Sequence, residues 1–396
     1  MRIALMCLLV VHALIHLLGF LKTWQLVDLP QLRSVTLFEP TAATARSIGA
    51  LWLVVSTLLL IAAALSLARA EFAWLYLAIA VAMSQLLILH AWSDAKAGTL
   101  VNLLLVVPIA IGAAHAQFAF QTDRIVQRMF LRAPAAATNP VEAGDLAHLP
   151  APVQHWLTAS GVLGKAPVRS VRLKQTGDMR TSARGAWMPT RADQYFTVTE
   201  PGFVWQADVT MGYGLSFSGR DSYVDGKGRM LIKALGLWPI VDASDDKIQQ
   251  GTLLRFLGEA IWFPSAALSP YMQWEGIDAS SARATITQHG VSASGVFAFD
   301  DAGRVTRFSA QRYMGSGASA KLERWVIPLH DWKVLGGTLV PTQGDVVWKL
   351  AGGDFDYYRF KIERIEYDQP HPYSKAHSAL PANEPPATLV SANTTP

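Results

Sequence analysis

Apolar positions follow two different patterns along this chain, and the change comes near Asp123. Before that residue lie four long uncharged blocks, counting histidine as neutral: Ile3–Leu21, Ser47–Ala68, Phe72–Trp92 and Ala97–Gln121. A helix of about 20 apolar residues crosses the roughly 30 Å hydrocarbon core of a bilayer. The pattern therefore predicts a membrane α-helical bundle of four spans in residues 1–122.

The links between the blocks predict how the helices connect. Arg69 and Glu71 lie in a very short second link and Ser93–Lys96 forms a short third, so tight turns should join the last three helices. The first link is longer and is expected to lie on the membrane surface. The first block is long and no A-x-A cleavage site follows it, which favours a retained helix over a signal peptide.

Beyond Val168 apolar and polar residues alternate, as in strands with one buried face. Segments such as QYFTVT, FVWQADVT and FKIERIEY have this period, and Gly, Asp and Pro separate them. Asp300–Gly303 (DDAG) and Asp225–Gly228 (DGKG) predict hairpin turns. About ten such strands predict a mainly antiparallel β domain in residues 151–369, built as a sandwich, barrel or half-barrel.

One segment in this half has helical periodicity instead. Gly251–Trp262, GTLLRFLGEAIW, places its three leucines and Ile261 on one face, with Arg255 and Glu259 opposite. A lone amphipathic helix among strands must bury its apolar face, most simply against the concave side of a curved sheet. The predicted fold is therefore a curved sheet or half-barrel with one inserted helix.

Two further segments surround this domain. Residues 123–150 are predicted to be a linker, with a basic amphipathic stretch and then an Ala- and Pro-rich one. A short helix, PVQHWLTAS, begins at Pro152, and Gly161 ends it. Residues 370–396, rich in Pro, Ala, Ser and Thr, are predicted to be a disordered tail.

Composition and charge narrow the possible functions. The chain is 51% hydrophobic and 16% charged, whereas soluble domains carry about 25% charged residues. Cys7 is the only cysteine, which excludes an internal disulfide and a zinc site of several thiolates. Basic residues are scattered, so no nucleic-acid partner is expected. The nine basic residues that flank the four blocks divide five against four between the two membrane sides. We therefore expect a multi-pass protein of a bacterial inner membrane, with the side of the β domain undetermined.

Polar residues inside the apolar blocks suggest a site in the membrane. His12 and His16 are four residues apart on one helix face, and His90 and Asp94 share a face in the same way. Ionisable groups at membrane depth are costly and usually face the bundle interior. One hypothesis is a metal, haem or quinone site formed by all four, and the alternative is hydrogen bonding between helices.

Three kinds of function remain for the β domain. An enzyme acting on a lipid-linked or cell-envelope substrate would use Glu259 and Asp221 as an acid/base pair, although no G-x-S-x-G or H-E-x-x-H motif is present. A membrane sensor or structural scaffold is the second kind. The third is binding of an apolar or lipid-like ligand in a cavity between sheet and helix, with aromatic walls and a polar group held by charged residues. The predicted ligand-binding residues are Phe203, Trp205, Arg220, Arg255, Glu259 and Trp262.

Several long segments resemble a known family. LPAPVQHWLTASGVLG, PGFVWQADV, GRDSYVDGKGRMLIKALGLWPIVDA and LLRFLGEAIWFPSAAL follow one another as in a bacterial domain family of unknown function, over Leu149 to Tyr367. VHALIHLLGF and HAWSDAKAGTLVN resemble the membrane extension of some members. This resemblance implies no activity. At the level of architecture, a curved sheet with a helix on its concave face is similar to periplasmic lipoprotein carriers, which hold acyl chains, and that likeness implies an apolar ligand.

Overall fold

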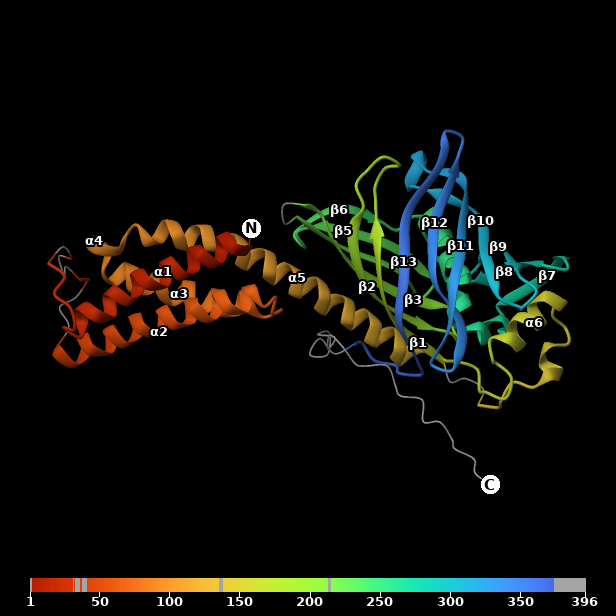
Figure 1. Ribbon diagram of the computed structural model, residues 1–396, viewed down its shortest axis with the longest axis horizontal. Coiled ribbons are helices and arrows are strands. Elements are labelled where there is room, and N and C mark those ends of the chain that lie inside the picture. Colours follow the sequence, from red (N-terminus) through yellow and green to blue (C-terminus); the bar gives the residue numbers. More distant parts are fainter. Residues whose placement is uncertain are drawn as a thin grey trace, which may run out of the picture.

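A bundle of long helices lies beside a strongly curved sheet, and one helix, α5, runs from the first into the second (Figure 1). This computed structural model describes residues 2–30, 32, 36–37, 41–134, 138–212 and 215–373. Four helices within these ranges are long and apolar enough to cross a membrane, as predicted: α1 (Arg2–Thr23), α2 (Ala42–Leu67), α3 (Ala73–His90) and α5 (Gly98–Arg132). The short helix α4 (Trp92–Ala95) lies between α3 and α5.

The bundle packs through small residues and turns apolar side chains outward. The α-carbon of Gly19 lies against the indole of Trp52, and that of Gly112 lies against Trp74, so a side chain at either glycine would collide with the ring system. Leu103 and Leu104 are exposed on the outer side of α5. Close contacts at small residues and an apolar outer surface are typical of helices packed in hydrocarbon.

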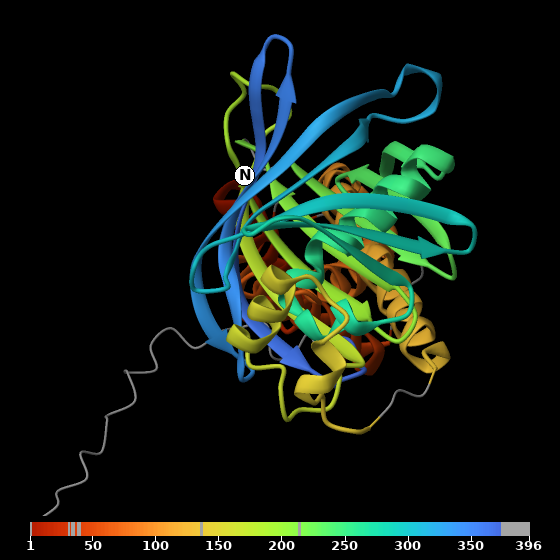
Figure 2. The same ribbon diagram turned by 90° about the vertical axis from the view of Figure 1, so that its right-hand side faces the viewer.

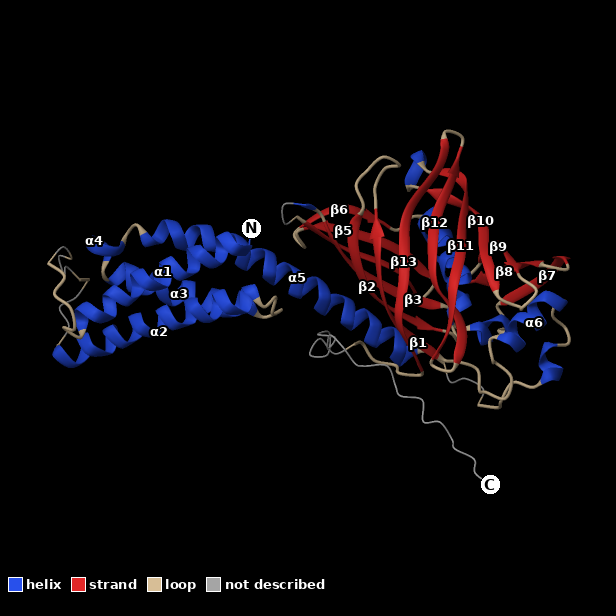
Figure 3. Cartoon of the chain, in the orientation of Figure 1, coloured by secondary structure: helices blue, strands red, loops and turns tan. Residues whose placement is uncertain are grey.

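The second half is one antiparallel sheet (Figure 3). Its thirteen strands, within the described residues, are β1 (Ser170–Met179), β2 (Met188–Thr197), β3 (Gly202–Thr210), β4 (Ser216–Val224), β5 (Lys227–Ala234), β6 (Trp238–Ala243), β7 (Met272–Asp278), β8 (Ser281–Gln288), β9 (Val291–Phe299), β10 (Val305–Met314), β11 (Lys321–Leu335), β12 (Thr338–Leu350) and β13 (Gly353–Tyr367). The spatial order is β6-β5-β4-β3-β2-β1-β13-β12-β11-β10-β9-β8-β7. The chain therefore forms two meanders that meet at the β1–β13 pair and end at the edge strands β6 and β7.

The topology explains the inserted helix. The chain must travel from one edge of the sheet, β6, to the opposite edge, β7, and it does so through α7 (Asp246–Glu259) and the 3₁₀ turns η3 (Ala260–Trp262) and η4 (Pro264–Leu268). Irregularities in five strand pairs bend the sheet, and it curls around α7 (Figure 2). The predicted half-barrel with one inserted helix is confirmed.

The helix begins five residues before the predicted Gly251. The side chain of Asp245 accepts hydrogen bonds from the backbone N–H groups of Lys247 and Ile248, and this N-cap allows the polar first turn to be helical. The predicted turns are present, with positive φ at Asp225 and Gly226 between β4 and β5 and at Gly303 between β9 and β10.

The segment predicted to be a linker packs against the sheet. Helix α5 continues to Arg132, and Val126, Met129 and Phe130 contact Tyr195 and Val204 on the outer face of β2 and β3. Further along, the 3₁₀ turn η1 (Ala143–Leu146) and helix α6 (Ala151–Ala159) bring apolar side chains into the core of the β domain.

The predicted tail begins in contact with the domain. The ring of Tyr373 lies 5.9 Å from that of Tyr195, and the guanidinium of Arg172 lies over it. Residues 374–396, which form the rest of the predicted disordered tail, lie outside the described residues.

Candidate functional site

A cavity of about 590 Å³ lies inside the half-barrel, between the concave face of the sheet and α7. Its walls come mostly from inward-facing residues of β1–β6 and β10–β13. The side chains that line it are largely aromatic, aliphatic or methionine, among them Met179, Met188, Trp205, Met211, Phe217, Met230, Ile232, Trp262, Trp325, Ile327, Trp348, Phe355 and Phe360. Methionines are adaptable apolar contacts, so this wall suits an apolar ligand of variable shape.

Three charged side chains meet on the α7 side of the cavity. Nε of Arg255 donates to Glu259 Oε1 at 2.8 Å, and its Nη1 donates to Asp221 Oδ2 at 2.8 Å. Arg255 and Glu259 are one turn apart on α7, while Asp221 points inward from β4. The guanidinium also lies 4.8 Å from the ring centre of Trp205. We call these three residues the Arg255 triad.

Two glutamines extend the triad across the sheet. Gln194 donates to Glu259 Oε2 at 2.7 Å, Gln175 donates to Gln194 Oε1 at 2.9 Å, and Tyr358 donates to Gln175 Oε1 at 2.8 Å. Sequence reasoning missed both glutamines. The signal was available in the alternation, because Gln175 and Gln194 occupy positions on the apolar faces of β1 and β2.

Both members of the predicted acid/base pair, Asp221 and Glu259, form ion pairs with Arg255. The Asp221 and Glu259 side chains are only 7% and 11% exposed, and each is bound to Arg255. Burial raises the pKa of Glu259, and the contacts with Arg255 and Gln194 oppose this rise. The two carboxyls line one cavity, and each gives an oxygen to Arg255, so their role as an acid/base pair stays a prediction.

Two polar atoms in the cavity wall have unused hydrogen-bonding capacity. Asp221 Oδ1 and Arg312 Nε are buried without a hydrogen-bond partner. Within the described residues Arg312 makes no ion pair, and its guanidinium lies 4.5 Å from the ring centre of Trp325 and 5.9 Å from that of Trp348. Buried polar groups are normally satisfied, so these two atoms are the places where a ligand or water would bind.

The side chains of two predicted ligand-binding residues, Arg220 and Phe203, do not point into the cavity. Arg220 borders the cavity, but its Nη1 donates to Thr122 of α5 at 3.1 Å and its guanidinium lies over Phe118. Neighbouring residues in a strand point to opposite faces, so the inward position of Asp221 turns Arg220 outward. Phe203 is fully buried in the core beside Phe196 and does not line the cavity. Trp205, Arg255, Glu259 and Trp262 do line it, as expected.

The polar residues of the bundle form a separate cluster. His12 and His16 are each 2% exposed. His12 Nε2 hydrogen-bonds with Asn102 Oδ1 at 3.0 Å, and His16 Nε2 with Ser84 Oγ at 2.8 Å, while Ser84 and Asn102 bond to each other. We call these four residues the histidine cluster.

The structure does not bring together the four residues of the predicted membrane site, His12, His16, His90 and Asp94. Within the described ranges, no three His, Cys, Asp or Glu side chains are placed to hold a metal ion. Asp94 lies 3.9 Å from Lys22, which is about 15 Å along α1 from His12, since each helical residue rises about 1.5 Å. The two pairs therefore lie at different depths in the bundle.

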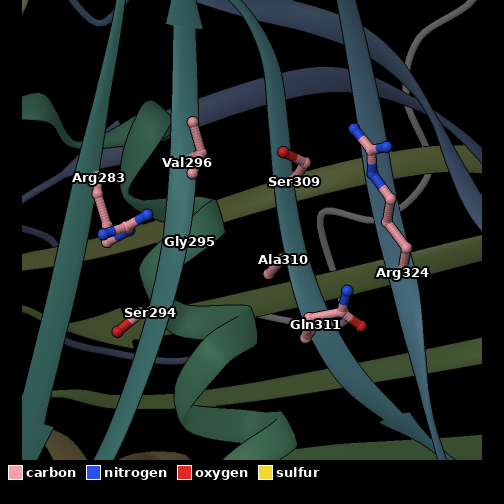
Figure 4. Close-up of a pocket in the computed structure, with 8 residues that line it drawn as sticks. All are labelled: Arg283, Ser294, Gly295, Val296, Ser309, Ala310, Gln311 and Arg324. Atoms are coloured by element: carbon pink, nitrogen blue, oxygen red, sulfur yellow. The ribbon is translucent and has the colours of Figure 1, made fainter. Parts of the chain in front are cut away.

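A second hollow, of about 330 Å³, lies on the outer face of β8–β11 (Figure 4). Its floor consists of small residues such as Ser294, Gly295 and Ala310, and Arg283 and Arg324 stand at its sides. No buried, unpartnered polar atom among the described residues lines this hollow. It is therefore a weaker candidate than the inner cavity.

Comparisons with known proteins identify a family over the second half of the chain. A model described as a family of unknown function, DUF6544, matches residues 139–360. Two solved structures also match. One is a LolA superfamily protein from Nitrosomonas europaea, with 11% sequence identity and a TM-score of 0.31; the match covers 54% of this chain and 92% of that one. The other is a beta-barrel-like protein of DUF1849 from Brucella abortus, with 10% sequence identity and a TM-score of 0.18; the match covers 51% of this chain and 98% of that one. No curated protein matches.

Proposed function

This chain belongs to the DUF6544 family of unknown function, and we propose that it is a multi-pass membrane protein whose β domain binds an apolar, lipid-like ligand in the half-barrel. The observation that carries this proposal is the cavity of about 590 Å³ with aromatic and methionine walls. Ligand pockets usually measure about 300–1,000 Å³ and combine apolar walls with a few placed polar groups. Each methylene buried there would contribute about 0.8 kcal/mol to binding.

The polar end of the ligand would bind at Arg312. This guanidinium has no ion pair within the described residues, whereas Arg255 is already bound by two carboxylates. A carboxylate, phosphate or other acceptor would therefore complete the hydrogen bonding of Arg312 at small desolvation cost. The Arg255 triad would act as a fixed polar wall that holds α7 against β4.

Membrane anchoring supports an apolar ligand. Four helices in the described part of the chain are long and apolar enough to span a bilayer, and α5 continues from them into the β domain. A cavity held beside a bilayer is close to the main store of apolar molecules in a cell. The chain would thus reside in a bacterial inner membrane, with its cavity on whichever side carries the β domain.

Filling the cavity from within tests this proposal. Gly219 lines it, and a β-carbon added there would have its nearest contact at 3.8 Å, with Trp205, so Gly219→Leu should occupy the cavity without collision. The matched control is Gly144→Leu in η1, where nothing lies within 4 Å. Full-length protein would be extracted in a mild detergent, and its bound molecules would be identified by native mass spectrometry and lipid extraction.

We expect the wild type and Gly144→Leu to carry a bound amphiphile at equal levels, and Gly219→Leu to lose most of it. Circular dichroism would verify that both variants keep their strand content. Equal ligand content in all three proteins, or none in any of them under conditions that preserve the fold, would overturn the proposal.

A further inference from the structure

The rim of the cavity lies at the level where the apolar part of the bundle ends. Trp74, in the first turn of α3, packs on Gly112 of α5, and the charged link with Arg69 and Glu71 directly precedes α3. The two helices run in opposite directions, so His115, one turn beyond Gly112, is level with that link. His115 also lies about 25 Å along α5 from its first residue, Gly98, and this length is close to the roughly 30 Å thickness of a hydrocarbon core.

The β domain contacts α5 at this level. The ring of His115 hydrogen-bonds with Ser218 Oγ at 3.0 Å and with Ser216 Oγ at 3.3 Å. The α-carbon of Gly236, in the β5–β6 turn, packs on the backbone of α5 at His115. One end of β4 and the β5–β6 turn therefore lie at the predicted surface of the bilayer.

Large apolar side chains are exposed at the same place. Trp238 and Ile240 on the edge strand β6 are 62% and 57% exposed, and Leu215 before β4 is 45% exposed. The Leu235 N–H bonds to the Ser216 carbonyl, and Ala234 pairs with Trp238, so the Trp238 end of β6 lies near Leu215. Tryptophan is enriched at membrane surfaces, where its ring is buried and its N–H remains hydrated.

The cavity reaches this apolar edge. Ile240 lines the cavity as well as being exposed, and Phe217, next to Ser216, lines it too. Ile240 therefore belongs both to the rim of the cavity and to the exposed apolar patch.

We propose that Leu215, Trp238 and Ile240 insert into the surface of the same bilayer that the bundle crosses, so that the cavity opens onto lipid and its ligand enters from the membrane. This inference rests on the membrane anchoring in the proposed function. The boundary between lipid headgroups and hydrocarbon would cover this patch, because α5 connects the patch directly to the apolar helices. A ligand that moves along this route avoids exposing its chain to water.

Spin labels would measure the depth of the patch in the full-length protein. The background is Cys7→Ser, and the labelled variants are Trp238→Cys, Ile240→Cys and, as a matched control, Ile277→Cys. Ile277 lies on the opposite edge strand, β7, and is 48% exposed, similar to Ile240. In vesicles of phosphatidylethanolamine and phosphatidylglycerol, collision rates with oxygen, which concentrates in hydrocarbon, would be compared with those of a water-soluble nickel chelate.

We expect oxygen to dominate at positions 238 and 240 and the nickel chelate at 277. Nickel-dominated collisions at all three positions would overturn the inference. So would dipolar broadening between labels at 238 or 240, because it would indicate that a second copy covers the patch. Lipid extraction of the same samples keeps the two proposals distinguishable. A patch in hydrocarbon with no lipid extracted from the cavity would contradict only ligand binding. A patch exposed to water with a bound lipid would contradict only insertion into the bilayer.

Discussion

The molecule contains two buried polar clusters that differ in what surrounds them. In the histidine cluster, His12, His16, Ser84 and Asn102 bond mostly to one another between packed helices. In the Arg255 triad the charges are also paired, but they border a cavity of about 590 Å³, and one oxygen of Asp221 has no partner. Polar residues in an apolar region were the reason for predicting a site in both halves.

The comparison shows that a buried polar group indicates a site only when space adjoins it. In the bundle, hydrogen bonds within the cluster and to the backbone replace water for these groups, except at Nδ1 of His12, which is buried without a partner. In the half-barrel, Arg255 and Glu259 have hydrogen-bond partners, whereas Nε of Arg312, which faces the cavity, has none among the described residues. We therefore interpret the histidine cluster as a contact between helices, and the cavity of the half-barrel is where we propose that a ligand binds.

The largest expected effect comes from breaking the triad. Arg255→Met would leave two buried carboxylates without their shared cation, and such a loss typically costs about 3–5 kcal/mol. We expect the free energy of unfolding of the β domain to fall by this amount in denaturant titrations followed by tryptophan fluorescence. Adding Asp221→Asn and Glu259→Gln should restore most of it. An Arg255→Met protein as stable as the wild type would show that the triad does not hold α7 in place.

A smaller effect, on binding alone, is expected at Arg312. Arg312→Met would remove the unpaired donor in the cavity, and a hydrogen bond to a charged group is worth about 1.5–3 kcal/mol, or at least tenfold in Kd. Palmitate would serve as the probe in a fluorescence titration. The control is Arg324→Met, which lies on the outer face beside β10 and should leave Kd unchanged. A Kd altered equally in both variants would exclude Arg312 as the anchor.

The smallest effect is expected in the histidine cluster. Asn102→Ala would remove the hydrogen bonds to His12, Ser84 and Gln85, and side-chain hydrogen bonds between membrane helices are worth about 0.6–1.7 kcal/mol. Thermal unfolding in detergent should therefore shift modestly, whereas Leu103→Ala on the exposed side of α5 should not shift it. Ligand content should not change. A metal or haem absorption lost in the Asn102→Ala protein would restore the cofactor hypothesis.

Local patterns in the sequence determined the elements. Uncharged blocks of helical length predicted the four apolar helices, and a helical period predicted α7. Alternation predicted about ten strands, whereas the described residues form thirteen. These predictions succeeded because burial of one face depends on residues close in sequence. The outward direction of Arg220 also follows from alternation once Asp221 is known to point inward.

Only the tertiary structure decided which of these residues meet. Asp221 and Arg255 are joined by the path of the chain around the sheet edge, and Gln194 reaches Glu259 only because the sheet curls over α7. Register, curvature and helix packing are long-range properties, set by the sum of many weak contacts rather than by any local period. The sequence by itself therefore determined two halves and their elements, and the fold decided that one polar cluster is closed by its neighbours while the other borders an open cavity.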